Sequence, residues 1–389
     1  MNMRTLIVLR GAPGCGKTTW IKKNNLEEYT LCLDTIRNMM ISPRMNHEAG
    51  YFDISFKYDS KAWQMLFELL EERMKEGELT LVDAVHSRPV DFSRYKDLAE
   101  KYRYRLYCVD FSSIPIEEAF SRNVSRPYYG TADTIRASLE NIYARFKSFA
   151  IPKYFTVLNP NDSIWDFLDQ KPIDVSNYKK IVFIGDIHGC FSPLEKYFNE
   201  NPFSEENLYV FLGDYFDRGI QNDKVCEWLL NHFENKNVML LTGNHEKWFI
   251  SYANEEYKDI NECKSTEFKL NTIPQLESFN KKDLRQLSRK FIQCAYLKFN
   301  DKKFICTHTG MGFMPTHLQC TASQEMIRGG KYEEDVDLWF ETNNHDENLY
   351  QVHGHRNMFD HPIDKFTHSF NLNEAVEFGE NLRIMEVTK

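Results

Sequence analysis

The sequence predicts an α/β protein with two domains, each built around a parallel sheet that is covered by helices. Short apolar segments that suit strands alternate with segments of helical spacing, which is the pattern of parallel sheets. The alternation lapses once, in the polar segment DQKPIDVSNYKK, and then restarts. A chain of 389 residues is also long enough for two domains of about 100–200 residues each. We therefore expect domains at residues 1–168 and 180–389, joined by a linker at residues 169–179.

In the first domain, strands and helices are expected in alternation. The expected strands are residues 5–10, 79–85 and 105–111. The expected helices are residues 61–75 and 134–149, because their apolar side chains recur at helical spacing. Asp133 is the expected N-cap of the second of these helices.

In the second domain, apolar runs again lead into turns that contain Gly with Asp or Asn. The expected strands are residues 180–184, 209–212, 238–241, 304–307 and 382–387. Residues 255–290 are charged and suit helices, and they resemble an insertion or a cap whose role stays open.

The composition excludes several classes of protein. Hydrophobic residues make up 42% and aromatic residues 14%, which is too many for a disordered chain. No apolar run reaches about 18 residues, so we expect no transmembrane helix and no membrane partner. A formal charge of −9 argues against a surface that is basic all over, but it allows one basic groove for nucleic acid. Nine cysteines without a CxxC pair suit free thiols in a reducing cytoplasm.

The first motif is GAPGCGKT at residues 11–18, which fits the phosphate-binding pattern G-x-x-x-x-G-K-[ST]. A strand before it and a helix after it argue against a chance match in a glycine-rich turn. The glycines let backbone amides turn toward a phosphate chain, Lys17 neutralises the phosphates, and Thr18 can bind Mg²⁺. The expected nucleotide-binding residues are Gly11, Gly14, Cys15, Gly16, Lys17, Thr18 and Thr19.

Five further residues suit the acceptor and lid of a phosphoryl transferase. In LCLDTIR, Asp34 ends an expected strand and could accept a proton from a hydroxyl, with Arg37 one helical turn later. A helix cap and a solvated arginine are the alternative interpretation. Asp83 ends the apolar strand LTLVD, where a metal-site carboxylate often stands. Arg122 and Arg126 are spaced to form either a lid over the phosphates or a solvated basic face.

In this order, the motifs GAPGCGKTTW, LDTIR, LVDAVHSR and EEAFSRNVSR resemble the polynucleotide 5′-kinase domain of phage and bacterial polynucleotide kinase–phosphatases. The resemblance covers roughly residues 1–155. It implies that ATP and Mg²⁺ bind at Lys17 and Thr18. The catalytic residues that it implies are Asp34 as general base for the 5′-hydroxyl, Arg37, Asp83, and the lid arginines Arg122 and Arg126.

The second half carries three motifs, GDIHG, GDYFDRG and GNHE, followed by THTG and HGH. Each of the three follows an apolar run, so their polar residues should emerge together at one edge of a sheet. The inventory suits two divalent metal ions, with Asp214 as the bridging ligand. The candidate ligands are Asp186 and His188 for one ion and Asn244, His308 and His355 for the other. Mixed nitrogen and oxygen donors suit Mn²⁺, Fe, Ni²⁺ or Zn²⁺ better than Ca²⁺, and we expect Mn²⁺.

The same motifs supply groups for phosphate hydrolysis. A water activated by both metals would attack phosphorus in line, and Arg218 would bind the phosphate oxygens. His245, oriented by Asp217, would protonate the leaving oxygen.

Residues 180–389 resemble the calcineurin-like metallophosphoesterase family, which implies an α/β sandwich with a two-metal site. His353 matches no ligand of that family, and its role stays open. The stretch SFNLNEAVEFGENLRIMEV also resembles the end of bacterial end-healing phosphatases of this family. In some of these an acidic residue stands in place of Asn373, so whether 2′,3′-cyclic phosphates are substrates stays open.

Together the two resemblances imply a bifunctional enzyme that heals RNA ends in the cytoplasm, or in the host cytoplasm if a phage encodes it. It would phosphorylate 5′-hydroxyl ends with ATP and remove 3′-phosphates, and a separate RNA ligase would seal the products. DNA ends and a homo-oligomer are both compatible with the sequence. One rival is a small-molecule kinase fused to a dinucleoside-polyphosphate hydrolase or protein phosphatase, and another is a non-catalytic nucleotide-binding module. The aromatic and basic residues between Met39 and Tyr58 should discriminate between end healing and the small-molecule enzyme, since a channel there would suit the end of a nucleic-acid strand.

Overall fold

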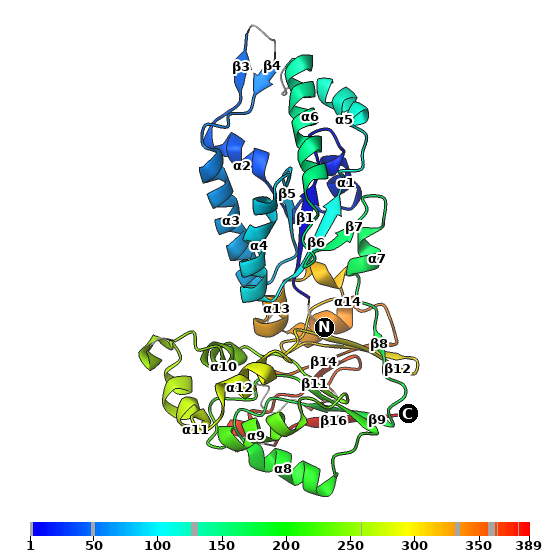
Figure 1. The fold of residues 1–389 in the computed structure, drawn as a ribbon. Coiled ribbons are helices and arrows are strands. Elements are labelled where there is room, and N and C mark those ends of the chain that lie inside the picture. The colour runs from blue at the N-terminus through cyan, green and yellow to red at the C-terminus, as the bar shows by residue number, and fades with distance from the viewer. Residues whose placement is uncertain are drawn as a thin grey trace. The chain divides into compact units, whose positions relative to one another are not determined.

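The structure, a computed structural model, describes residues 3–47, 51–125, 131–257, 259–330, 335–356, 362–363, 365–379 and 381–389. It divides into two compact units, each of which has the α/β fold that the sequence predicts (Figure 1). The N-terminal unit runs to Asp169 and includes Gln319–Ala322. The C-terminal unit comprises Gln170–Leu318 and Ser323–Lys389.

The N-terminal unit is built on a five-stranded parallel sheet in the order β2-β5-β1-β6-β7. These strands are β1 (Thr5–Arg10), β2 (Thr30–Cys32), β5 (Thr80–Asp83), β6 (Arg105–Asp110) and β7 (Thr156–Leu158). All six residues of the central strand β1 are buried. Leu6 and Val8 belong to one apolar cluster and Ile7 and Leu9 to another, so the sheet is covered on both faces.

Seven helices accompany this sheet among the described residues of the unit. They are α1 (Lys17–Lys23), α2 (Leu33–Met40), α3 (Asp59–Glu76), α4 (Pro89–Tyr102), α5 (Ile116–Val124), α6 (Ala132–Ser148) and α7 (Ile164–Leu168). Helices α3 and α4 pack on the Leu6 face, whereas α1 and α7 pack on the Ile7 face. A separate two-stranded ribbon, β3 (Arg44–Asn46) with β4 (Tyr51–Asp53), projects near the end of α2 (Figure 1).

Two local expectations in this unit are wrong. The N-cap of α6 is Thr131 instead of Asp133, because the Thr131 hydroxyl is the group that accepts a hydrogen bond from the Thr134 amide, at 3.4 Å. Asp34 does not end a strand. Strand β2 stops at Cys32, and Asp34 lies in the first turn of α2, where an acidic side chain suits the helix dipole.

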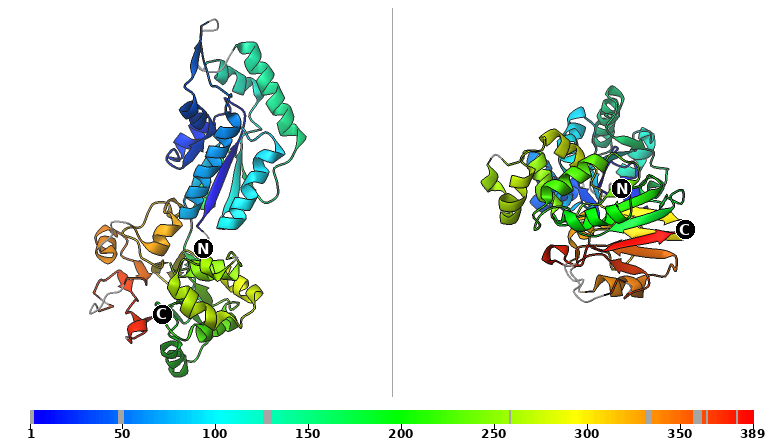
Figure 2. Two further views of the ribbon diagram at one scale, coloured as in Figure 1. Left: turned by 90° about the vertical axis from the view of Figure 1, so that its left-hand side faces the viewer. Right: turned by 90° about the horizontal axis from the view of Figure 1, so that it is seen from below.

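The C-terminal unit contains two sheets that pack face to face (Figure 2). The first has the order β11-β10-β9-β16, with strands β9 (Lys180–Ile184), β10 (Asn207–Phe211), β11 (Val238–Leu240) and β16 (Ile384–Thr388). The second has the order β15-β14-β13-β12-β8, with β8 (Ile173–Asp174), β12 (Ala295–Phe299), β13 (Lys302–Cys306), β14 (Leu349–His353) and β15 (Ser369–Asn371). Phe183 and Val210 of the first sheet share an apolar cluster with Leu297 and Phe304 of the second.

Strand β8 lies inside the segment that was expected to be a linker. It pairs in parallel with β12, so residues 173–174 are part of the C-terminal sheet. A two-residue strand is too short to produce a hydrophobic period, which explains why the sequence pattern does not show it.

Helices cover the outer face of the first sheet of this unit. The helices after residue 190 are α8 (Phe191–Glu200), α9 (Asn222–His232), α10 (Glu246–Ala253), α11 (Ile273–Leu276), α12 (Lys281–Ser288), α13 (Ser323–Arg328) and α14 (Val336–Asn343). Shorter turns are the 3₁₀ segments η1 (Ile260–Glu262), η3 (Leu318–Cys320) and η4 (Val376–Phe378), and the π-helical η2 (Phe268–Thr272). Residues 255–290 are therefore mainly helical in their described part, as expected.

Two expectations from composition can be compared with the structure. Each of the nine cysteines is a free thiol. None of the helices in the described ranges has both the length and the apolar character needed to cross a membrane.

Candidate functional sites

The turn between β1 and α1 has the backbone conformation of a phosphate cradle. Gly14 and Gly16 have φ values of 81° and 101°, which other residues rarely adopt. A Cβ on Gly14 would lie 2.3 Å from the Ala119 carbonyl oxygen, so a side chain has no room there. Cys15 is buried, and its Sγ lies 2.5 Å from where a Cβ on Gly11 would stand. The cysteine thus packs beneath the turn.

Lys17 lies at the start of α1 and points back across this turn. Its Nζ donates hydrogen bonds to the carbonyl oxygens of Gly11, at 2.8 Å, and Ala12, at 3.3 Å, and it lies 3.9 Å from Asp83 Oδ1. Burial alone would lower the pKa of Lys17, but the thiol of Cys15 and the carboxylates of Asp83 and Asp34 raise it overall. The ammonium therefore stays charged and available to a phosphate.

A cavity of about 400 Å³ joins the cradle to the predicted acceptor residues. The predicted residues that line it are Gly14, Gly16, Lys17, Thr18, Asp34, Arg37 and Asp83. Thr18 and Thr19 are exposed in the first turn of α1, where backbone amides and a helix N-terminus favour an anion.

Arg37 is held between two carboxylates on the acceptor side of this cavity. Its Nη1 donates to Asp34 Oδ1 at 2.6 Å, and its Nε donates to Asp59 Oδ1 at 2.9 Å. The guanidinium also lies 4.6 Å from the centre of the Phe56 ring. Asp59 was missed by the sequence analysis, because an acidic residue at the start of a helix normally indicates only a helix N-terminus.

Other residues on the cavity wall were also missed. His86 is buried, with its Nδ1 2.7 Å from the Leu9 carbonyl oxygen and its Nε2 2.8 Å from the Tyr95 hydroxyl. Burial lowers the pKa of His86 to about 4, so the imidazole is neutral at physiological pH. Arg88 and Arg145 line the same cavity, and the Arg88 guanidinium pairs with Asp91 of the cavity wall at 2.9 Å.

The predicted lid arginine Arg122 lies over the cradle. Its Nη1 is 3.6 Å from where a Cβ on Gly16 would stand, and its guanidinium pairs with Glu118. The neighbouring Asn123 donates a hydrogen bond to the Pro13 carbonyl oxygen at 2.7 Å, which ties α5 to the phosphate-binding turn. Arg126 lies outside the described residues.

In the C-terminal unit, the predicted metal ligands gather where strands end. Asp186, Asp214 and Asn244 follow β9, β10 and β11, and His308 and His355 follow β13 and β14. The carboxyl ends of these strands meet at one edge, which is where α/β sheets form their sites.

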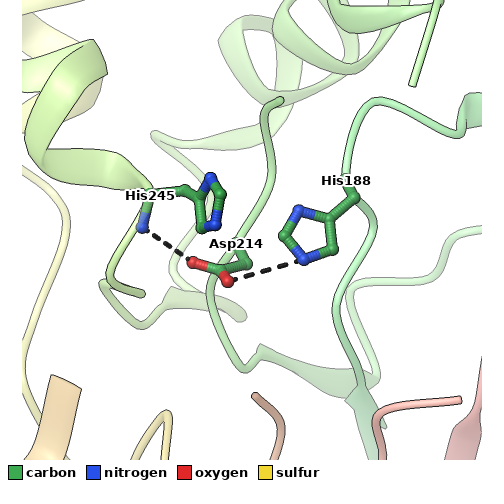
Figure 3. Close-up of side chains that lie close together, drawn as sticks. All are labelled: His188, Asp214 and His245. Atoms are coloured by element: carbon green, nitrogen blue, oxygen red, sulfur yellow. Dashed lines mark hydrogen bonds and ion pairs between the residues drawn. The ribbon is translucent and has the colours of Figure 1, made fainter. Parts of the chain in front are cut away.

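Asp214 is at the centre of this cluster. Its Oδ2 lies 3.5 Å from His188 Nε2 and 3.3 Å from His308 Nε2, and its Oδ1 accepts a hydrogen bond from the His245 amide at 3.0 Å. Figure 3 shows the Asp214 carboxylate between the two imidazoles of His188 and His245. Two groups of donors, each within 4.8 Å, share this carboxylate. They are His188, Asp214 and His245, and Asp214, His308 and His355.

The buried charges of the cluster suit divalent cations. Asp186 Oδ2 accepts a hydrogen bond from the His355 amide at 2.9 Å, but its buried Oδ1 accepts none from the residues that the structure describes. Burial raises the pKa of Asp186 to about 8. Burial alone would lower the pKa of His308, but Asp214 and Asp186 raise it to about 10. A dry site with a carboxylate oxygen that accepts no hydrogen bond from the described residues, and with imidazole nitrogens nearby, has the donor chemistry of a transition-metal site. Asn244 Oδ1 lies 3.2 Å from His308 Nε2 and extends this set of donors.

Glu246, within the GNHE motif, supports the site without being one of the predicted ligands. Its carboxylate accepts hydrogen bonds from the amides of Gly243, Asp214 and Tyr215, at 2.6, 2.8 and 2.9 Å. It thereby fixes the loops after β10 and β11 relative to each other.

His245 forms a pair with Asp217. Its Nδ1 lies 2.7 Å from Asp217 Oδ2, and Asp217 is fully buried. Burial alone would lower the pKa of His245, but the carboxylates of Asp217 and Asp214 raise it. Because Nδ1 is used by Asp217, Nε2 is the nitrogen from which His245 could donate a proton.

The sequence left open the roles of His353 and Asn373. The ring nitrogens of the buried His353 lie 2.8 Å from Asp337 Oδ1 and 2.9 Å from the Gly354 carbonyl oxygen, so this histidine has a structural role. Asn373 accepts a hydrogen bond from the Ala375 amide at 2.9 Å and shapes a turn. The acidic residue that contacts Arg218 is Glu377, which sequence spacing alone does not reveal.

Comparisons with known proteins agree with this division of the chain. The family model described as calcineurin-like phosphoesterase matches residues 179–384, more than half of the chain, and the model described as AAA domain matches residues 6–149. A cold-active protein-tyrosine phosphatase from a Shewanella species is 15% identical, with 57% of this chain and 78% of that chain covered and a TM-score of 0.35. A serine/threonine phosphatase from Saccharomyces cerevisiae is 19% identical, with 51% and 70% covered and a TM-score of 0.34. A Chloroflexus aurantiacus protein described provisionally as a kinase is 16% identical, with 41% and 89% covered and a TM-score of 0.31.

Proposed function

This chain belongs to the calcineurin-like phosphoesterase family, and we propose that it is a bifunctional enzyme that heals broken RNA ends. Its N-terminal unit is a P-loop kinase-like domain that uses a nucleotide with Mg²⁺, and its C-terminal unit is a metal-dependent phosphoesterase. In the proposal, the first unit phosphorylates 5′-hydroxyl ends and the second removes 3′-phosphates. The resulting 3′-hydroxyl and 5′-phosphate are the ends that a separate RNA ligase would join.

The observation that carries the proposal is the composition of the N-terminal cavity. It combines a phosphate cradle with a carboxylate, Asp34, and with three arginines, Arg37, Arg88 and Arg145. An acceptor that offers only a hydroxyl needs a base to take its proton, but it needs no arginines. Several arginines around it favour an acceptor that carries phosphate close to its hydroxyl, as a polynucleotide 5′ end does.

The residues of the N-terminal unit would divide the transfer between them. Asp34 accepts the proton of the attacking hydroxyl, and Arg37 holds Asp34 in place through the bond between them. Lys17 and Arg122 balance the charge of the transferred phosphoryl group. Bound Mg²⁺ would supply further charge neutralisation, with Thr18 and Asp83 as the residues placed to hold it.

In the C-terminal unit, Arg218 binds the phosphate oxygens and His245 donates the proton that the leaving oxygen needs. Asp217 keeps the imidazole charged and oriented through the bond at 2.7 Å. Two divalent ions, for which Mn²⁺ suits the nitrogen and oxygen donors, would supply Lewis-acid activation of the attacking water. The residues placed to hold them are Asp186, His188, Asp214, Asn244, His308 and His355.

Competition between substrates tests the proposal. The protein is given radiolabelled ATP with Mg²⁺ and equal concentrations of a 5′-hydroxyl RNA oligonucleotide, the matching DNA oligonucleotide and a nucleoside. We expect label on the RNA, with the nucleoside a poor acceptor because it lacks the phosphates that the arginines bind. In parallel, a 3′-phosphate oligonucleotide, a 2′,3′-cyclic phosphate oligonucleotide, a dinucleoside polyphosphate and a phosphopeptide are compared with Mn²⁺. A preference for the nucleoside, or for the last two substrates, would refute end healing.

A further inference from the structure

Thr272, in the helical region at residues 255–290, contacts the phosphatase site. We propose that Thr272 is a positioning residue for phosphate hydrolysis, because it holds the Asp217 carboxylate in the orientation that His245 requires. The inference rests on the proposed function of the C-terminal unit, since it assumes that His245 donates a proton.

The two oxygens of the Asp217 carboxylate have different partners. Oδ2 lies 2.7 Å from His245 Nδ1, and Oδ1 accepts a hydrogen bond from the Thr272 hydroxyl at 2.7 Å. Neither Asp217 nor Thr272 is exposed to solvent. A carboxylate in a dry site cannot turn without breaking one of these bonds, so the Thr272 hydroxyl selects the orientation that faces His245.

The backbone around Asp217 also depends on the helical region. Asp217 and Arg218 have φ values of 76° and 64°, which are unfavourable for residues other than glycine and need support from their surroundings. The Asp217 amide donates to Asn222 Oδ1 at 2.9 Å, and the Asn222 amide donates to Gln275 Oε1 at 2.7 Å. The helical region therefore supports this turn at two points, through Thr272 and through Gln275.

Thr272 lies in a segment that is packed into the apolar core. It is the last residue of the π-helical segment η2, which continues directly into α11. Single π-helical turns are rare and often occur at functional sites. Phe268, Ile273 and Leu276 of these two segments are buried in the same apolar cluster as Phe216, which belongs to the GDYFDRG motif. The hydroxyl is thus held by the core that also holds the loop it contacts.

The consequence for the reaction is specific to the leaving group. His245 can give its Nε2 proton to a leaving oxygen only while Asp217 fixes the ring through Nδ1. Without the Thr272 hydroxyl, the carboxylate can turn and the ring loses this orientation. The loss should be large for an alkyl phosphate, whose leaving oxygen must be protonated, and small for a nitrophenyl phosphate, whose leaving group departs as a stable anion.

The experiment compares Thr272→Ala with Thr272→Ser in the full chain loaded with Mn²⁺, because these two substitutions differ only in the hydroxyl. Thr272→Val keeps the volume without the hydroxyl. Ser288→Ala is the matched control, since it removes a buried hydroxyl of the same region that bonds the Arg285 carbonyl oxygen. We expect Thr272→Ala and Thr272→Val to slow alkyl phosphate turnover about 10- to 100-fold, the effect of one hydrogen bond to a charged group. Aryl phosphate turnover and metal content should change little, and Thr272→Ser and Ser288→Ala should resemble the wild type.

Equal turnover of Thr272→Ala and Thr272→Ser would overturn the assignment, because the hydroxyl would then have no role. Equal losses on the alkyl and aryl esters would also overturn it, because they would indicate general damage to the site. If Thr272→Val does not fold, the comparison of alanine with serine still decides. A wild-type protein that hydrolyses neither ester would refute the proposed phosphatase function itself. An active wild type whose turnover equals that of Thr272→Ala would refute only the role of Thr272.

Discussion

At the scale of single residues, we propose opposite tasks for Asp34 and His245, and their surroundings differ accordingly. The Asp34 side chain is 42% exposed and bonded to Arg37, so it can meet an incoming hydroxyl and take its proton. His245 is largely buried between the carboxylates of Asp214 and Asp217, which raise its pKa and keep a proton available for donation. The local electrostatics thus suit a base in one unit and an acid in the other.

Asp34→Asn tests the proposed base. The substitution keeps the shape of the side chain but removes its ability to accept a proton, so phosphoryl transfer should fall by about 10²- to 10⁴-fold. Nucleotide affinity should change little, because Lys17 and the glycine-rich turn remain. The measurement is single-turnover transfer from ATP to a 5′-hydroxyl oligonucleotide, with ATP affinity from equilibrium titration. Transfer at the wild-type rate would show that Asp34 is only a helix residue.

Asp214→Ala and His245→Ala should separate metal binding from proton donation. Asp214 contacts donors of both metal groups, so its removal should cost metal and activity together. His245→Ala should leave the metal content near that of the wild type and slow alkyl phosphates more than aryl phosphates. The measurements are metal content by mass spectrometry and turnover of both esters. Full metal occupancy in Asp214→Ala, or loss of metal in His245→Ala, would reverse the two roles.

At the scale of elements, the features that could be predicted are those encoded locally. The strand, the glycine-rich turn and the helix of residues 5–23 lie next to one another in sequence, and the three Gly-Asp or Gly-Asn turns directly follow their strands. Asp59, Glu377 and Thr272 reach their sites only through tertiary packing, so no spacing in the sequence reveals them. The π-helical turn before Thr272 likewise has no pattern of its own in the sequence.

His86 joins two elements of the N-terminal unit, since it contacts the Leu9 carbonyl of β1 and the Tyr95 hydroxyl of α4. In the unfolded chain its pKa is near 6.5, whereas burial lowers its pKa to about 4 in the folded protein. Between these values the unfolded chain binds the proton first, so acidification should destabilise the folded unit. The expected loss between pH 7 and pH 5 is about 2 kcal/mol.

The measurement is thermal unfolding of the full chain at several pH values, following the transition that ATP shifts upward. The control is His86→Gln, which can still form hydrogen bonds but cannot titrate, and its transition should lose most of this pH dependence. A wild-type transition temperature that does not change between pH 7 and pH 5 would show that the pKa of His86 is not lowered in the folded unit.

At the scale of the whole molecule, the central claim is that one chain holds two separate phosphate chemistries that act on the two ends of a broken strand. The residues of the two sites do not interleave. The kinase-like residues all precede Asp169, and the phosphoesterase residues all follow Gln170. The charged groups of each site pair with one another, and the hydrogen bonds that support each site lie within its own unit. A substitution at the centre of one site should therefore leave the other site intact.

The most direct test uses one oligonucleotide with a 5′-hydroxyl and a 3′-phosphate, incubated with ATP, Mg²⁺ and Mn²⁺, and resolves both ends after reaction. We predict that the wild type adds a 5′-phosphate and removes the 3′-phosphate. Lys17→Ala should abolish only the first change, and Asp214→Ala only the second. Loss of both changes in a folded Lys17→Ala protein, or a wild type that alters neither end, would contradict the account.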